Sequence, residues 1–132
     1  MTKHKIVLVP FPFDDLSTNK VRPAVCLTDP ITEHKHIILA FITSRVPDTP
    51  LATDLVIDKN DQDFALTGLH VSSTVQLHRL MTLTTSLIRR ELGQLSPEIQ
   101  TKVEQRLYQL FSLPAPELKD ENPAQDRGNA PS

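Results

Sequence analysis

His36-Ile-Ile-Leu-Ala-Phe-Ile-Thr-Ser44 is an almost unbroken apolar run with the length of one β-strand. A run of this length that lacks alternating polar positions is typical of a strand buried on both faces. Pro47 and Pro50 follow the run and interrupt the strand pattern. We therefore predict that residues 36–44 form a strand in the middle of a sheet.

Other strand patterns lie on both sides of this run. Upstream, residues 5–11 and 21–28 are rich in β-branched and aromatic types, and the polar loop 14–20 joins them as a hairpin with a long tip. Downstream, Val75 and Leu77 alternate with Gln76 and His78 within residues 73–80, which is the pattern of a half-buried strand. Shorter strands are expected at 54–57 and 87–92.

One segment has a clear helical period. Ser96 is placed to cap it, Pro97 suits the first helical position, and Ile99, Val103, Leu107 and Leu110 form an apolar stripe. These features predict a helix over about 97–111. Several short strands with one terminal amphipathic helix describe a mostly β (α+β) protein, a small antiparallel barrel with the helix packed on its surface.

The length of 132 residues suits one domain, which we assign to residues 1–111. Residues 112–132 are rich in proline and acidic side chains and are predicted to be a disordered tail. This tail accounts for the whole formal charge of −2, so residues 1–111 are neutral. Residues 1–47 hold six Lys/Arg against four Asp/Glu, and we expect any field that attracts phosphate near this N-terminal half.

The sequence excludes several classes of protein and site. The single Cys26 cannot form an internal disulfide, and no apolar run has the length of a membrane helix or a signal peptide, so we expect a cytoplasmic protein. No glycine-rich phosphate loop or Cys/His metal spacing is present, so we expect no cofactor and no metal. His34 and His36 could approach a metal together, but a third ligand is missing nearby.

Six sequence blocks carry a resemblance to a known family. They are Ile6-Val-Leu-Val-Pro-Phe-Pro-Phe13, Asp15-Leu16-Ser17, Lys20-Val21-Arg22-Pro23-Ala24-Val25, Ala40-Phe41-Ile42-Thr43-Ser44, the stretch from Gly68-Leu69 to Ser73, and Leu92-Gly93-Gln94-Leu95-Ser96. In order and spacing, over about residues 5–111, they resemble the PemK/MazF-like toxins. The resemblance implies an SH3-like β-barrel, a homodimer, and a toxin of a type II toxin–antitoxin system with a cognate antitoxin. It also implies metal-independent, sequence-selective cleavage of single-stranded RNA by attack of the 2′-hydroxyl on the adjacent phosphate.

The family's catalytic arginine corresponds to Arg22, and its Thr/Ser position corresponds to Thr43. A guanidinium can hold a phosphate by two hydrogen bonds and stabilise the charge that develops on its oxygens. Without the resemblance, a salt bridge or a solvated loop end is the alternative for Arg22. A bond to its own backbone is the commoner role for a threonine at a strand end such as Thr43.

The later strand departs from the family pattern. Where members carry an arginine and, two residues on, an aspartate, this chain has Gln76 and His78. A histidine titrates near neutral pH, so His78 could act as general acid or base, or it could simply be a surface residue. The departure leaves a second hypothesis open, which is a barrel that binds RNA or protein without catalysis. A third is a toxin relative that acts mainly as an assembly partner.

Further substrate contacts are expected beside these residues. Ser44 adjoins Thr43, Lys20 precedes Arg22, and Arg45 follows the central strand. The two cations could contact neighbouring phosphates without reading bases. Loop 14–20 and the stretch 45–53 are candidates for covering an RNA channel, because single-stranded RNA is read through its splayed bases.

Overall fold

A computed structural model describes residues 1–10 and 20–114 of the chain. One six-stranded antiparallel sheet has the strand order β4-β5-β3-β2-β1-β6. The strands are β1 (Lys5–Pro10), β2 (Val21–Cys26), β3 (His36–Thr43), β4 (Asp54–Ile57), β5 (Ser73–Thr84) and β6 (Arg90–Gln94). Short 3-10 turns, η1 (Phe64–Thr67) and η2 (Thr85–Leu87), flank β5, and the helix α1 (Pro97–Leu110) ends the described part.

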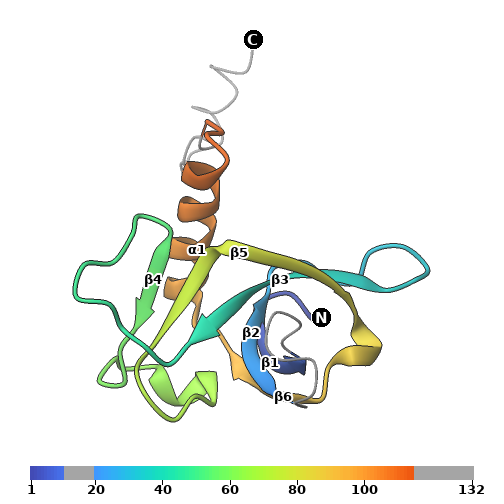
Figure 1. Ribbon diagram of the computed structural model, residues 1–132, viewed down its shortest axis with the longest axis horizontal. Coiled ribbons are helices and arrows are strands. Elements are labelled where there is room, and N and C mark those ends of the chain that lie inside the picture. Colours follow the sequence, from blue (N-terminus) through green and yellow to red (C-terminus); the bar gives the residue numbers. More distant parts are fainter. Residues whose placement is uncertain (11–19, 115–132) are drawn as a thin grey trace, which may run out of the picture.

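The sheet curls into a half-barrel, and α1 stands outside the curl (Figure 1). The predicted class, a mostly β antiparallel barrel with a C-terminal helix, is confirmed. The central position of 36–44 is confirmed as well, because β3 lies between β5 and β2. The predicted loop 14–20, apart from Lys20, and the predicted disordered tail beyond 114 lie outside the described residues.

Two hydrophobic clusters cover the two faces of the sheet. Along β3, Ile37, Leu39 and Phe41 belong to the cluster inside the curl. Ala40 and Ile42 belong to the cluster beneath α1, together with buried side chains of the helix and of β4 and β5. The alternation of β3 between two apolar environments explains why its sequence shows no alternation of polar and apolar types.

The strand β5 is bent by a large bulge. Its register against β3 changes from Ala40 opposite Leu80 to Ile42 opposite Val75, so that residues 76–79 of β5 lie opposite Phe41 alone. Figure 1 shows the bend, with one arm of β5 beside β4 and the other along the start of β3. A bulge adds local twist and changes which face successive side chains occupy.

The ends of β5 and β6 differ from the prediction. We expected one strand to end at 80 and the next to begin at 87, but β5 continues to Thr84 and β6 begins at Arg90. Residues 80–84 pair with the start of β3, and Met81 and Leu83 pack on the cluster inside the curl. The intervening residues form the turn η2.

The turn η1 lies directly on β6 through two glycines. Gly68 ends η1 with a φ of 73°, and a Cβ there would lie 2.1 Å from the carbonyl oxygen of Leu92. A Cβ on Gly93 would lie 2.1 Å from the carbonyl oxygen of Leu66. Only glycine allows the two backbones to approach this closely. This contact fixes where the chain leaves η1 toward β5.

The helix begins as the sequence predicts. The Ser96 hydroxyl accepts a hydrogen bond from the Ile99 N–H at 3.3 Å, and Pro97 occupies the first turn. Ile99 and Val103 are buried against the sheet. Arg106 donates from Nη1 to the carbonyl oxygens of Ala52 and Asp54, which ties α1 to the start of β4. No helix in the described ranges is long and apolar enough to span a membrane.

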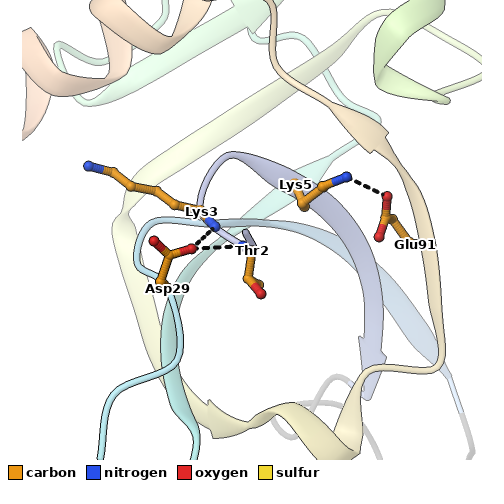
Figure 2. A network of polar contacts seen from close by, with 5 residues as sticks. All are labelled: Thr2, Lys3, Lys5, Asp29 and Glu91. Atoms are coloured by element: carbon orange, nitrogen blue, oxygen red, sulfur yellow. Dashed lines mark hydrogen bonds and ion pairs between the residues drawn. The ribbon is translucent and has the colours of Figure 1, made fainter.

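Polar contacts hold the start of the chain to the sheet (Figure 2). The backbone N–H groups of Thr2 and Lys3 donate to Asp29 Oδ1 at 2.7 and 2.9 Å. The Lys3 and Thr2 donors hold the pKa of the Asp29 carboxyl below its usual value. Lys5 Nζ forms an ion pair with Glu91 of β6 at 2.9 Å. These contacts fix β1 between its two neighbouring strands.

Candidate active site

A groove of about 870 Å³ opens where β2 begins and β3 ends, between the bend of β5, the loop after η1 and the start of β6. Four arginines line it, and each comes from a different element: Arg22 from β2, Arg45 from the residues after β3, Arg79 from β5 and Arg90 from β6. Among the described residues, no aspartate or glutamate lines this groove. We call it the arginine groove, and its arginines carry a formal charge of +4 in a chain whose net charge is −2.

Local hydrogen bonds position the residues that follow β3. The Thr43 hydroxyl accepts from the Arg45 N–H at 3.2 Å, and the Thr74 hydroxyl donates to the Arg45 carbonyl oxygen at 2.7 Å. The first bond is the backbone role that a strand-end threonine commonly has. It uses one acceptor site of Thr43, so the hydroxyl proton can still be donated to a ligand. Ser44 and Arg45 are thereby directed along the groove wall.

Arg22 is the second residue of β2 and pairs with Val9 of β1. The buried Val9 and Ala24 hold this part of the hairpin against the cluster inside the curl. Arg22 itself is exposed and lines the arginine groove together with Thr43. The two residues to which the resemblance assigns the chemistry thus share one surface, although they are 21 positions apart in the sequence.

A second groove of about 720 Å³ adjoins the first, and we call it the side groove. Thr43, Arg45 and Gln76 line both grooves and form the wall between them. His78 lines the side groove only, and its Nδ1 lies 2.9 Å from the Thr53 hydroxyl oxygen. The side groove also contains Asp48 and the buried Asp54, so its charge is mixed.

The structure thus brings five of the seven predicted site residues into the arginine groove. They are Arg22, Thr43, Ser44, Arg45 and Gln76. His78 lies in the side groove next to this set, whereas Lys20 is exposed and lines neither groove. The roles of all seven remain predictions.

Three groove residues with ionisable side chains were missed by the sequence analysis: Arg79, Arg90 and His70. Simple strand alternation would place Arg79 on the face opposite Gln76, and only the bulge at 76–79 brings both to one groove. Arg90 opens a strand whose start was predicted three residues too early. His70 lies in a loop, and no periodic pattern identifies a loop residue.

The described residues contain no cluster of three or more His, Cys, Asp or Glu that could hold a metal ion. His34 and His36 stack with ring centroids 5.7 Å apart, without a third ligand from the described ranges. Burial, with a smaller contribution from Glu91, raises the pKa of the Cys26 thiol to about 11. Cys26 is therefore a core residue without nucleophilic character near neutral pH.

A family model and several solved structures match the chain. The family model described as the PemK-like, MazF-like toxin of type II toxin-antitoxin system matches residues 2–111. The Mycobacterium tuberculosis toxin MazF-mt6 is similar in structure, with a TM-score of 0.65 and 22% identity over 84% of this chain and 99% of that one. No curated protein matches the chain in sequence.

Two further solved structures are similar. One is an endoribonuclease in complex with its cognate antitoxin from a mycobacterial species, with a TM-score of 0.64 and 16% identity over 88% of this chain and 99% of that one. The other is a chain of the MazE-MazF complex (Form-II) from Deinococcus radiodurans, with a TM-score of 0.61 and 17% identity over 86% of this chain and 97% of that one. At these identities the likeness establishes the fold.

Proposed function

Because the chain belongs to the PemK-like, MazF-like toxin family of type II toxin–antitoxin systems, we propose that it is an endoribonuclease that cuts single-stranded RNA at selected sequences without a metal ion. The observation that carries the proposal is the arginine groove. A concave surface lined by four guanidinium groups, with no carboxylate from the described residues, suits a polyanion. The four arginines come from four different elements, so they are spread around the groove and can contact more than one phosphate of a bound strand.

The proposed reaction is an internal transfer of the phosphate. The 2′-oxygen attacks the adjacent phosphorus, the bond to the 5′-oxygen breaks, and the products are a 2′,3′-cyclic phosphate and a 5′-hydroxyl. No water molecule is consumed in this step, and the proposed reaction uses no metal ion. Arg22 binds the non-bridging oxygens and stabilises their developing charge, and the Thr43 hydroxyl donates a hydrogen bond to the same phosphate.

His78 is proposed as the group that accepts the proton of the 2′-hydroxyl. An imidazole can accept a proton near neutral pH, whereas an arginine cannot. His78 borders the wall formed by Thr43 and Gln76, and its contact with Thr53 fixes the ring. In this role it replaces the aspartate that the family pattern carries. Gln76, Ser44 and Arg45 are proposed to bind the substrate around this point, and Lys20 to contact a phosphate outside the groove.

The proposed protein partner follows from the positive charge of the arginine groove. A cognate antitoxin that lays an acidic, flexible segment over the arginine groove would block RNA by occupying its phosphate sites. The similar structures include an endoribonuclease bound to its antitoxin and a MazE-MazF complex.

We also propose a homodimer, because β4 and β6 are sheet edges that association can cover. The proposed location is the cytoplasm, where RNA is available.

The test is cleavage of a long, unstructured RNA by the purified protein in EDTA, with cut sites and end groups mapped. We expect discrete cuts with cyclic-phosphate and 5′-hydroxyl ends. Arg22→Ala should lower the rate by about 10²–10³-fold or more, as removal of one transition-state donor does. Arg89→Ala is the matched control, because Arg89 is exposed and lies outside the arginine groove. A folded Arg22→Ala protein that cuts at the normal rate would overturn the proposal.

A second candidate is a barrel that binds RNA or protein without cutting. The observation that favours it is the groove's lack of a carboxylate from the described residues, since a carboxylate is a common general base. Binding of RNA in the absence of any cut, over a panel of sequences, would support this candidate against the nuclease.

A further inference from the structure

His70 lies in the wall of the arginine groove, and its side chain is exposed. The other polar side chains that line this groove, within the described ranges, are arginines, hydroxyls and one amide. None of these groups exchanges a proton readily near neutral pH, whereas an imidazole does. His70 is thus the described groove residue that is chemically suited to move a proton.

The loop that carries His70 is anchored at both ends. On one side, Gly68 is pressed against Leu92 with no room for a Cβ, and the Leu69 N–H donates to the Thr67 hydroxyl at 3.1 Å. On the other side, the Ser73 hydroxyl donates to the Val71 carbonyl oxygen at 2.8 Å. His70 is therefore presented to the groove by a short segment with fixed ends, which a catalytic group needs.

His70 and His78 line two different grooves that share one wall. Both grooves share Thr43, Arg45 and Gln76, whereas His70 lines only the arginine groove and His78 only the side groove. In phosphoryl transfer the attacking and leaving oxygens lie roughly in line, on opposite sides of phosphorus. A phosphate bound at the rim of this wall, where the two grooves meet, would face one histidine from each groove.

We propose that His70 is the general acid of the reaction, and this inference rests on the proposed nuclease function. The 2′-oxygen forms its bond to phosphorus as its proton passes to His78. The bond from phosphorus to the 5′-oxygen breaks, and its electron pair goes to that oxygen, which takes a proton from the His70 imidazolium. The histidines return to their starting states by exchanging protons with water.

The test uses two RNA oligonucleotides that span a mapped cut site. One is natural, and the other has sulfur in place of the bridging 5′-oxygen, because a thiolate leaves without needing a proton. His70→Gln should cut the natural RNA about 10²–10⁴-fold more slowly than wild type, the usual contribution of acid–base catalysis. It should cut the sulfur RNA at close to the wild-type rate. His78→Gln should be slow on both.

The controls separate this inference from the proposed function. His34→Gln, at an exposed histidine outside both grooves, should match wild type on both substrates. If wild type cuts neither RNA, the nuclease function fails, and the role of His70 fails with it. If wild type cuts both but His70→Gln cuts natural RNA at the normal rate, or is slow on both RNAs alike, only the general-acid role is overturned. His70→Asn serves if the glutamine variant does not fold.

Discussion

Replacing Arg90 by glutamine removes one positive charge from the arginine groove. The neighbouring Arg89 provides a matched control. Arg90 lines the groove, whereas its neighbour Arg89 is also exposed and does not. Arg89→Gln therefore makes the same change in charge at the same end of β6. Any difference between the two variants reports contact with bound RNA and not the net charge of the protein.

The expected size of the effect follows from the number of arginines in the groove. Binding of a single strand releases counterions, and the logarithm of affinity falls with the logarithm of salt with a slope of about −0.7 per neutralised phosphate. If each of the four arginines neutralises one phosphate, the slope is about −2.8 for wild type and for Arg89→Gln, and about −2.1 for Arg90→Gln. Between 50 and 200 mM salt, affinity should fall about 50-fold in the first case and about 20-fold in the second.

The measurement is fluorescence anisotropy of a labelled single-stranded RNA whose 2′-hydroxyls are methylated, so that the strand binds but is not cut. Titrations at several KCl concentrations give the slope for each protein. Equal slopes for the two variants would refute the placement of Arg90 on the path of the phosphates, and a wild-type slope near zero would refute the groove as a polyanion site.

Three further predictions concern the fold. Gly93→Ala should lower the free energy of unfolding by about 3 kcal/mol in a urea melt, because its Cβ would meet backbone atoms of η1; an unchanged midpoint would contradict the contact with Leu66. Burial lowers the pKa of His4, so the unfolded chain takes up the proton first and stability should fall as pH drops below about 6.5. His4→Asn, which suits the φ of 76°, should flatten that pH dependence. Cys26 should resist alkylation at pH 8 until urea unfolds the chain, and rapid labelling of the native protein would disprove its burial.

The sequence specifies the elements whose signals are local. The apolar run of β3, the Ser96 cap and the alternation of Val75 with Gln76 all depend on neighbouring residues, and all appear in the structure as predicted. The bulge in β5 depends on how two strands align across the sheet, and no local pattern records that alignment. The strand predicted at 87–92 is present as β6, but it begins at Arg90 for a related reason, since η2 forms where the long β5 ends.

The site could be predicted only in part. The resemblance to a known family pointed to Arg22, Thr43 and their neighbours. Arg79 enters the groove through the bulge, and His70 enters through the close packing of η1 on β6. Both depend on contacts between segments distant in sequence, which a single sequence does not reveal. The N-terminal half supplies only two of the four groove arginines, so the positive field is less concentrated there than the charge distribution suggests.

The strand β3 contributes side chains to both hydrophobic clusters, and this affects how the protein unfolds. Its side chains belong alternately to the cluster inside the curl and to the cluster beneath α1, so separating either cluster exposes one side of the same strand. Partial opening of one half is therefore disfavoured, and the amide protons of β3 and of residues 80–84 of β5, which pair with it, should exchange with solvent mainly through global unfolding. A protease that needs an opened segment would then find the barrel accessible chiefly in the fully unfolded state.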